Sequence, residues 1–584
     1  MAGSGDAELQ GQRRRIAWLA TLFAMVGLVI SVRLVQWMVL PQPLLDEAQS
    51  AVRSLTNRIV ATRGNVLDAS GQYLAVSTVA YRVSVSPRLL TQSERDALAP
   101  VLAGLLDLPE EQVATSLARE DTEYEVLADG VPFWTAMEIQ DLRKSALRLE
   151  VAFGREYPDG DLASAVLGFR MTRDKGQAQY GLEQYWDAEL SGRDGMWRGI
   201  SDLWGQQILV NESGYVPAED GVDLLLTLDR NIQRRAEEIL RETIEEYEAV
   251  DGSIVVLDPR TGGILAMAEF PGYSPAAYWY VSSSDVYVNG AVSTAYEPGS
   301  VFKPLTIAAA LEARVILPTD TYDDRGEIIV GGHRIFNSDL RPHGTTTMTE
   351  LLAYSRNVGA AHVASLLGPT RFYETVRKFG FSEITGVDLW GEAAGVMRVP
   401  GNQYWHMSDL GANSYGQGLS ATPLQVAAAF GALANRGVLM RPYIVAEERY
   451  PDRTEVRRPF PVRQVVSPAV AEQVSTMLAD AVEMGMQKAA VPGYRLAGKS
   501  GTAGIGEEGY VSGDAIVSFV GYGPLPDPRF VILAKFDKPE QGRWGVEVAA
   551  PAFQQMAKYL IDYYGIPPAS NGTLASAGEA PSRN

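Results

Sequence analysis

The chain begins with a long hydrophobic segment. Residues 16–32 carry no charge, and apolar character continues past Arg33 to Leu40. A helix rises about 1.5 Å per residue, so residues 16–40 predict a transmembrane helix across a hydrocarbon core of about 30 Å, with the charged end of Arg33 reaching the interface. Trp18 and Trp37 would lie near the two interfaces. No second span appears in the sequence, which indicates a single-pass membrane protein.

The basic residues Arg13–Arg15 immediately precede this segment. Positive charge favours the cytoplasmic side, so we expect a cytoplasmic tail over residues 1–15 and an extracytoplasmic position for everything from Pro41 onward. A cleaved signal peptide is the alternative. It is less favoured because no small-x-small cleavage site precedes Leu40 and Pro41.

The remaining pattern divides the chain further. Residues 41–245 mix short strands and helices, with a hairpin over residues 63–75. Residues 246–565 carry hairpins at both ends, over 252–269 and 519–536, and helical runs between them, such as 423–434. This order predicts an α+β domain with an antiparallel sheet flanked by helices. Residues 566–584, rich in Pro, Ser, Ala and Gly, predict a disordered tail.

Composition narrows the function classes. The chain has 584 residues, enough for about three domains, and its net charge of −20 provides no basic face for nucleic acid. It contains no cysteine, which excludes disulfides, thiolate nucleophiles and cysteine zinc sites. None of its four histidines stands in a metal-binding pattern, so we expect no metal and no cofactor. Those histidines are His333, His343, His362 and His406.

The strongest candidate for chemistry is Ser300 followed three residues later by Lys303. It is the only place in the chain where a serine stands three residues before a lysine. Turn residues precede it and an apolar helical run, 305–311, follows it, so both side chains would share one face at a helix start. Lys303 could then serve as the general base for Ser300.

Two more motifs follow in the order that serine acyl-transfer enzymes with a lysine base require. Ser355-Arg356-Asn357 precedes a helical stretch, and Lys499-Ser500-Gly501-Thr502 follows a strand-like segment, where Gly501 would leave room for a peptide backbone. The tripeptide Ser-Arg-Asn recurs at residues 582–584, so only order and context favour Ser355.

These motifs resemble those of the penicillin-binding protein and serine β-lactamase superfamily. The flanking sequence resembles the class B penicillin-binding proteins from about Arg13 to Gly565, with a non-catalytic, dimerisation-type pedestal over residues 41–245 and a transpeptidase domain over 246–565. The segments that resemble the pedestal are Arg63–Asp68, Arg155–Pro158, Gly168–Phe169 and Gly181–Leu190, with Gly192 and Gly195.

The resemblance implies a role for each site residue. Ser300 would attack the penultimate D-Ala carbonyl of a stem peptide, Lys303 would take its proton, and the amides of Ser300 and Thr502 would form the oxyanion hole. Ser355 would relay a proton and Asn357 would hold Lys303. Lys499, Ser500 and Thr502, with Gly501 between them, would bind the substrate's terminal carboxylate. Arg356 is not fixed in the family, and Ser274-Pro275-Ala276 departs from its usual Asp-Pro-Asn.

The implied function is peptidoglycan D,D-transpeptidation at the plasma (inner) membrane, with covalent inhibition by β-lactams. Segments 155–158 and 386–392 look more like the division type than the elongation type. Because residues 41–245 lack a glycosyltransferase domain, we expect a SEDS-family glycosyltransferase and other cell-division membrane proteins as partners. A β-lactamase is excluded because the chain has no Glu-x-x-Leu-Asn, and no Tyr-x-Asn between Lys303 and Lys499. An elongation-type enzyme and a catalytically inactive scaffold remain alternatives.

Overall fold

The computed structural model describes most of the chain. The described residues are 5–39, 54–119, 121–171, 177–201, 207–208, 215–504 and 514–568. The predicted tail beyond residue 568, the first residues of the predicted pedestal (41–53) and the Trp37 side chain lie outside them. The chain divides into two units, which are described separately: Met1–Ala61 with Arg193–Glu219, and Thr62–Gly192 with Asp220–Asn584.

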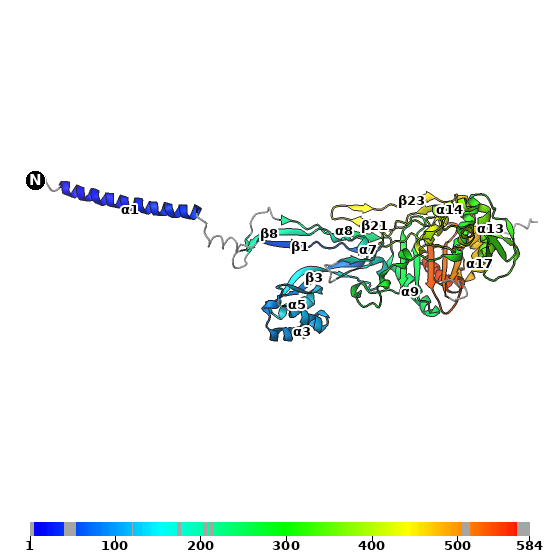
Figure 1. Ribbon diagram of the computed structural model, residues 1–584, viewed down its shortest axis with the longest axis horizontal. Helices are drawn as coiled ribbons and strands as arrows, with labels where there is room; N and C mark the ends of the chain where they lie inside the picture. Colours follow the sequence, from blue (N-terminus) through cyan, green and yellow to red (C-terminus); the bar gives the residue numbers. More distant parts are fainter. Residues whose placement is uncertain are drawn as a thin grey trace, which may run out of the picture. The chain divides into compact units, whose positions relative to one another are not determined.

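The first unit contains the helix α1, Gly5–Val39 (Figure 1). Its apolar part, Arg13–Gln36, has a mean hydropathy of 2.1, and it is the one helix among the described residues long and apolar enough to cross a membrane. The helix begins before the predicted residue 16 because the polar residues ahead of the span, including Glu8 and Arg13, are themselves good helix formers.

The same unit contains a small antiparallel sheet. Its strands lie in the order β1-β8-β10, with β9 also paired to β8. Asp194, just before β8, accepts a 2.9 Å hydrogen bond from the Ala61 amide and pairs with Arg58. The strands are β1 Ser54–Ile59, β8 Gly195–Ser201, β9 Gln207–Ile208 and β10 Tyr215–Val216.

In the second unit, a mixed sheet begins with the predicted hairpin of β2 and β3, in which Val66 pairs with Ala75. The sheet runs in the order β22-β21-β11-β2-β3-β4, with β5 also paired to β3. Figure 1 shows α3 and α5 gathered at one end of the long strand β3, where a separate small core includes Leu102 and Ile139. The strands are β2 Val66–Leu67, β3 Tyr73–Val85, β4 Glu125–Pro132, β5 Leu147–Glu156, β11 Asp223–Leu226, β21 Val445–Arg449 and β22 Thr454–Val456.

This sheet crosses the predicted boundary at residue 245. β21 and β22 belong to the later part of the chain, yet β21 pairs in antiparallel fashion with β11, Leu224 opposite Glu448. Asp388, which is buried, accepts hydrogen bonds from the amides of Ile444 and Val445 at 2.7 and 2.8 Å and so fixes the start of β21. The predicted domains therefore share one sheet.

A buried ion cluster stabilises the pedestal. Glu183 is fully buried and pairs with Arg63 at 2.5 Å and with Arg155 at 2.7 Å. Arg155 also donates to the Gly64 carbonyl at 2.7 Å. Because a buried carboxylate is costly without such partners, removing either arginine would be strongly destabilising.

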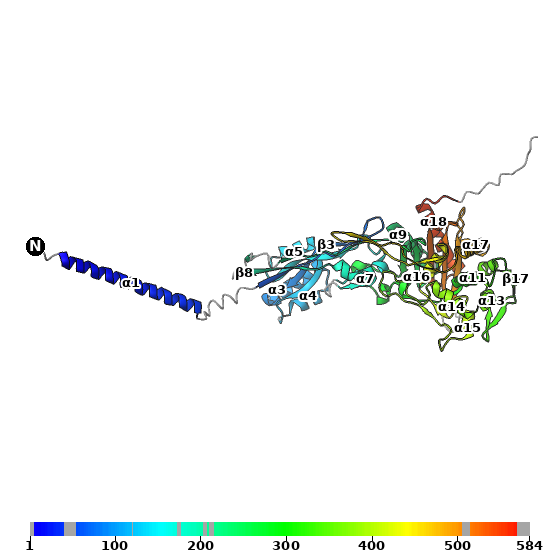
Figure 2. The same cartoon turned by 90° about the horizontal axis from the view of Figure 1, so that it is seen from above.

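The second sheet of this unit is antiparallel, in the order β13-β12-β26-β25-β24. Both predicted hairpins are confirmed: Val255 pairs with Met267, and Phe519 with Ala534. Helices α9 and α18 pack on one face and α16 and α17 on the other; Figure 2 shows α9 and α18 above α11, α13 and α14. The strands are β12 Asp251–Leu257, β13 Ile264–Phe270, β24 Ala497–Gly504, β25 Ala515–Gly523 and β26 Phe530–Asp537. This α+β architecture agrees with the prediction.

Helices and short strands complete the described elements. The longer helices are α3 Gln92–Leu106, α4 Glu110–Leu117, α5 Phe133–Asp141, α9 Arg230–Tyr247, α11 Lys303–Glu312, α13 Asn357–Leu367, α14 Pro369–Lys378, α16 Pro423–Ala434, α17 Pro468–Gly485 and α18 Gly545–Tyr563. The shorter helices are α6 Ser164–Leu167, α7 Gly181–Tyr185, α8 Asp187–Ser191, α10 Gly290–Ser293, α12 Met348–Ala353 and α15 Met407–Asn413. The 3₁₀ turns are η1 Pro87–Leu89, η3 Pro275–Ala277, η4 Ser284–Tyr287, η5 Gly299–Phe302 and η6 Gln487–Ala489. The short strand pairs are β6 Phe169–Arg170 with β7 Ala178–Gln179, β14 Thr321–Asp324 with β17 Gly344–Thr347, β15 Glu327–Val330 with β16 His333–Phe336, β18 Val396–Met397 with β19 Leu419–Ser420, and β20 Val438–Met440 with β23 Pro461–Gln464.

Candidate active site

Ser300 lies in the 3₁₀ turn η5, which continues directly into α11. The turn is fixed by Gly299, which has φ +59° and donates its amide to the Gly416 carbonyl at 3.0 Å. Side chains three residues apart eclipse one another in a 3₁₀ turn, and Lys303 Nζ accordingly lies 3.1 Å from Ser300 Oγ. Pro304 occupies the first turn of α11, where it removes no hydrogen bond.

Lys303 is fully buried, and its amine has neutral partners. Nζ donates to the Ser355 carbonyl at 2.6 Å and to Asn357 Oδ1 at 2.8 Å. A neutral amine has two N–H groups, and these two acceptors use both of them. The nitrogen lone pair is then left for a hydroxyl, which is the arrangement a general base for Ser300 requires.

Asn357 has a fixed orientation at the start of α13. Its Nδ2 donates to the Phe336 carbonyl at 3.0 Å, so Oδ1 must face Lys303.

Ser355 lies between the two lysines. Its Oγ is 3.0 Å from Lys303 Nζ and 3.0 Å from Lys499 Nζ. Its backbone has φ +58°, a conformation that non-glycine residues rarely adopt. This conformation lets the carbonyl and the hydroxyl of one residue both reach Lys303. The sequence gives no sign of this strain.

The third motif lies on β24, the edge strand of the sheet. Lys499 and Gly501 share one face of the strand, and Ser500 and Thr502 the other. Lys499 Nζ donates to the Ser500 carbonyl at 2.9 Å, and the Thr502 hydroxyl accepts the Gly545 amide at 3.0 Å. A single carboxylate that meets Lys499 and both hydroxyls must therefore lie at the open edge of β24.

The packing around Gly501 is a second reason for a glycine at this position. A Cβ atom there would lie 2.6 Å from Ser518 Oγ, 2.9 Å from the Pro298 carbonyl oxygen and 2.9 Å from Val301. The missing side chain thus makes room for the segment that carries Ser300. The η5 turn, Gly299–Phe302, and its flank therefore pack closely against β24 at Gly501.

The edge of β24 faces the η5 turn, Gly299–Phe302, which carries Ser300. A Cβ on Gly299 would lie 3.0 Å from the Thr502 carbonyl oxygen. Because the N–H and C=O of one strand residue point to the same side, the Thr502 amide also faces this turn. Ser300 lies in the first turn of a helix, where amides lack a partner within the helix. The two predicted oxyanion donors are thus on neighbouring segments.

Burial and charge lower the pKa of both lysines. Burial lowers the pKa of Lys499 to about 7. Burial first, then the Lys499 ammonium and the Arg356 guanidinium, lower the pKa of Lys303 well below its ordinary value. The repulsion between the two ammonium groups is mutual, but Lys303 is also opposed by the Arg356 guanidinium, which favours Lys303 as the neutral amine of the pair.

Arg356 is the residue of this region that sequence reasoning missed. Its NH1 donates to Asp339 Oδ2 at 2.7 Å. The position of Arg356 between Ser355 and Asn357 in the sequence already places it near the site. Its pairing with Asp339, however, depends on the fold. The histidines take other places: His343 pairs with Asp339 at 2.9 Å, and His362 stacks on Tyr322.

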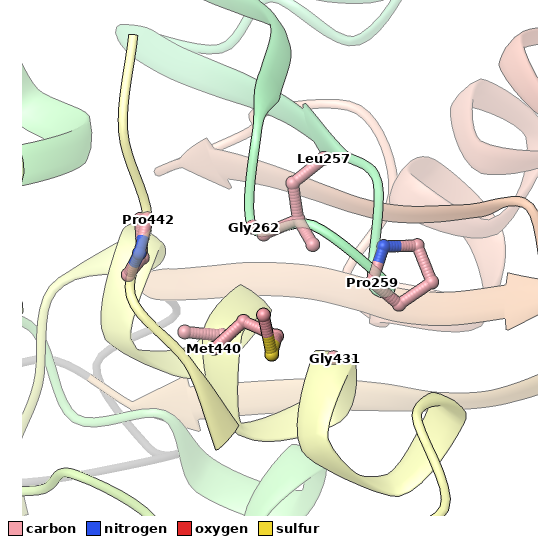
Figure 3. A pocket seen from close by; sticks show the side chains of 7 residues that line it. Leu257, Pro259, Gly262, Gly431, Met440 and Pro442 are labelled. Atoms are coloured by element: carbon pink, nitrogen blue, oxygen red, sulfur yellow. The ribbon is translucent and has the colours of Figure 1, made fainter. Parts of the chain in front are cut away.

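Outside this cluster, the described residues contain no group of three or more His, Asp or Glu side chains able to hold a metal. A hollow of about 520 Å³ beside α4 is lined by residues such as Glu111, Arg119 and Glu125, which include no nucleophile paired with a base. The apolar cavity lined by Leu257, Pro259 and Met440 (Figure 3) has a volume of about 10 Å³, too small and too apolar for a substrate. The cluster around Ser300 is therefore the site where the described residues support chemistry.

Comparison with known proteins identifies both folded regions. The penicillin-binding protein transpeptidase domain matches residues 252–558, and the penicillin-binding protein dimerisation domain matches residues 58–226. Stage V sporulation protein D of Bacillus subtilis is 33% identical over 87% of this chain and 79% of its own length. A probable peptidoglycan D,D-transpeptidase, PbpC of Pseudomonas aeruginosa, is 30% identical over 96% of this chain and 97% of its own.

Solved structures give the same result. Penicillin-binding protein 3 of Mycobacterium tuberculosis, complexed with aztreonam, has a TM-score of 0.68 and 28% identity, covering 88% of this chain and 98% of its own. A peptidoglycan synthetase of Bifidobacterium adolescentis has a TM-score of 0.70 and 25% identity, covering 89% and 98%. With its dimerisation region, its transpeptidase region and its serine–lysine cluster, this chain belongs to the class B penicillin-binding proteins.

Proposed function

We propose that this protein is a peptidoglycan D,D-transpeptidase that cross-links stem peptides through an acyl-enzyme on Ser300. The observation that carries the proposal is the Lys303 amine, which lies 3.1 Å from Ser300 Oγ while its N–H groups are used by Ser355 and Asn357. This leaves Lys303 ready to accept the serine proton.

In the acylation step, Ser300 Oγ attacks the penultimate D-Ala carbonyl carbon as its proton passes to Lys303. The amides of Ser300 and Thr502 stabilise the negative charge that develops on the carbonyl oxygen. The C–N bond to the terminal D-Ala then breaks. The leaving amine gains a proton through Ser355, whose hydroxyl lies 3.0 Å from each lysine amine. The products are an ester on Ser300 and free D-Ala.

The transfer step reverses these roles. An amine of a second stem peptide attacks the ester carbonyl and gives up a proton, through the same Ser355 path, to Lys303. The C–O bond to Ser300 breaks, and Ser300 Oγ regains a proton from Lys303. The result is a new amide between two stem peptides and an unchanged enzyme.

Lys499 is proposed to select substrates that end in a carboxylate. Together with Ser500 and Thr502, its cation recognises that group at the edge of β24. A β-lactam presents an anionic group beside a strained amide, so we propose that it acylates Ser300 in the same way. The complexes of penicillin-binding protein 3 of Mycobacterium tuberculosis with aztreonam and with ampicillin support this proposal.

We further propose that α1 anchors the protein in the plasma membrane with residues 1–15 in the cytoplasm. Arg13–Arg15 at the start of the apolar part of α1 support this orientation. A septal role is supported by relatives with division-type names, such as the FtsI protein of Buchnera aphidicola, 27% identical over 89% of this chain. The partners would be a SEDS-family glycosyltransferase and other division proteins. Segments 155–158 and 386–392 give weaker support for the septal role than their sequence suggested. Arg155 and Asp388 each have a structural role, which explains these residues without reference to division.

Mass spectrometry of the penicillin-treated protein tests the nucleophile. We expect one adduct on Ser300, no adduct in Ser300→Ala, and an unchanged adduct in the control Ser365→Ala, whose hydroxyl only meets its own helix at 2.7 Å. An adduct on another serine would overturn the assignment. Release of D-Ala and formation of cross-linked dimer from a stem peptide donor and an amine acceptor then test the transfer step.

Two observations in cells test the placement. A reporter fused after residue 584 should be active only outside the cytoplasm, and cytoplasmic activity would refute the orientation. A fluorescent fusion should gather at midcell. An even distribution along the sidewall would favour the elongation-type alternative.

A further inference from the structure

Arg356 stands between two residues that bind the Lys303 amine. Ser355 accepts from Lys303 Nζ at 2.6 Å through its carbonyl, and Asn357 accepts at 2.8 Å. Arg356 occupies the N-cap position of α13, yet its side chain caps nothing there. That side chain is 14% exposed. Arg356 therefore carries a largely buried positive charge, and it stands in the chain between two partners of the proposed general base.

The charge of Arg356 is only partly compensated. NH1 pairs with Asp339 at 2.7 Å, and the guanidinium lies 5.5 Å from the ring centre of Tyr354. Asp339 is 39% exposed and is shared with His343 at 2.9 Å. Among the described residues, Arg356 Nε has no hydrogen-bond partner. A buried charge that is balanced by one half-solvated carboxylate keeps a positive field around it.

We propose that Arg356 is a positioning residue that keeps Lys303 neutral in the resting enzyme, with Asp339 holding the guanidinium in place. The inference rests on the proposed role of Lys303 as general base. Lys303 has no ion pair within the described part of the chain, and the positive charges of Lys499 and Arg356 both lower its pKa. Two cations, Lys499 and Arg356, thus oppose a third positive charge at Lys303.

The surroundings contain few opposing charges. Asp339 and His343 lie between β16 and β17, Glu350 on α12, and Tyr322 and Asp324 on β14. The groups that interact with Lys303 or Arg356 are Lys499, Asp339, Glu350, Tyr322 and Tyr354. His343 pairs with Asp339, and Asp324 interacts with Tyr322. Only Asp339 pairs with the Arg356 guanidinium among the described residues.

The pH dependence of acylation tests this inference on the full chain in detergent. The second-order rate of labelling by a fluorescent penicillin is measured from pH 5 to 9 for the wild type, Arg356→Met and Arg356→Gln. Loss of a nearby positive charge should raise the midpoint of the acidic limb by about one pH unit. Labelling should fall about tenfold below that midpoint and approach the wild-type rate above it.

Two further variants separate charge from shape. Arg356→Lys keeps the charge and should restore the wild-type midpoint. Arg334→Met is the matched control, because Arg334 also pairs with a carboxylate, Glu327, and lies 5.6 Å from the ring centre of Phe336. It should leave the profile unchanged.

Three outcomes decide between the proposals. An unchanged midpoint in both neutral variants, with rates lowered equally at every pH, overturns the role of Arg356. A midpoint that shifts equally in Arg356→Lys overturns it as well, since charge would not be the cause. Failure of the wild type to be labelled at any pH instead refutes the proposed acyl-enzyme on Ser300.

Discussion

The charge on Lys499 gives the most direct test of how the proposed site recognises its substrate. Burial lowers the pKa of Lys499 to about 7. A lysine is charged below its pKa, so the cation proposed to bind the substrate carboxylate is lost as the pH rises. At pH 8 about one tenth of Lys499 would remain protonated, and at pH 9 about one hundredth.

The second-order rate of acylation by a β-lactam should follow this fraction, because that rate reports ionisations of the free enzyme. We expect it to fall about tenfold between pH 8 and pH 9. Lys499→Arg keeps a positive charge throughout this range but places it differently. The variant should therefore react about 10² to 10⁴ times more slowly at pH 7, and its rate should not decline from pH 7 to 9.

Stopped-flow labelling with a fluorescent penicillin measures both rates on folded protein. Lys378→Arg is the matched control, because Lys378 is an exposed residue in the last turn of α14. It should keep both the wild-type rate and the alkaline decline. The reasoning would be refuted by a wild-type rate that stays constant up to pH 9, or by the same decline in Lys499→Arg.

Three other changes have defined outcomes. Lys303→Arg should abolish labelling from pH 6 to 9, because a guanidinium cannot accept the Ser300 proton; full labelling would refute the lysine base. Gly501→Ala should lower stability by about 1–3 kcal/mol in chemical denaturation and slow labelling, because its methyl group would lie 2.6 Å from Ser518 Oγ; an unchanged unfolding curve would contradict this packing. Burial raises the pKa of Glu269 to about 8 from 4.5, so the folded protein holds a proton that the unfolded chain loses, and stability should decline as the pH rises through this window. Glu269→Gln should flatten the decline between pH 5 and 8.5, and an equally steep decline in the variant would count against this origin.

Sequence reasoning succeeded where the physics is local. The spacing of Ser300 and Lys303 is enough to place both side chains on one face of any helical turn, and the structure has them 3.1 Å apart. Hairpins with alternating strands and short turns, such as β12 with β13, were also predictable. The three motifs, in their order along the chain, indicated the family, because the chemistry of that family requires all three at one site.

Sequence reasoning could not predict features that depend on contacts between segments far apart in the chain. The φ of +58° at Ser355 and the pairing of Arg356 with Asp339 depend on segments that meet only after folding. The substrate-binding role of Gly501 stays a prediction, but the sequence could not show that a side chain there would also meet Ser518 Oγ and the Pro298 carbonyl, which come from other segments. The division at residue 245 stays a prediction, but no local pattern along the chain reveals that β21 pairs with β11.

The pairing of β21 with β11 limits how this enzyme can be divided. A chain cut at residue 246 would keep the hairpin of β21 and β22 but lose β11. The backbone N–H and C=O groups on one side of Val445–Arg449 would then have no partner strand. Exposed edges recruit other strands, and a two-stranded ribbon alone is only marginally stable. The transpeptidase region is therefore not structurally independent, and we do not expect it to fold correctly when it is transferred to another protein by itself. A chimera that exchanges it must carry residues 223–226 along, or supply a strand that fits in their place.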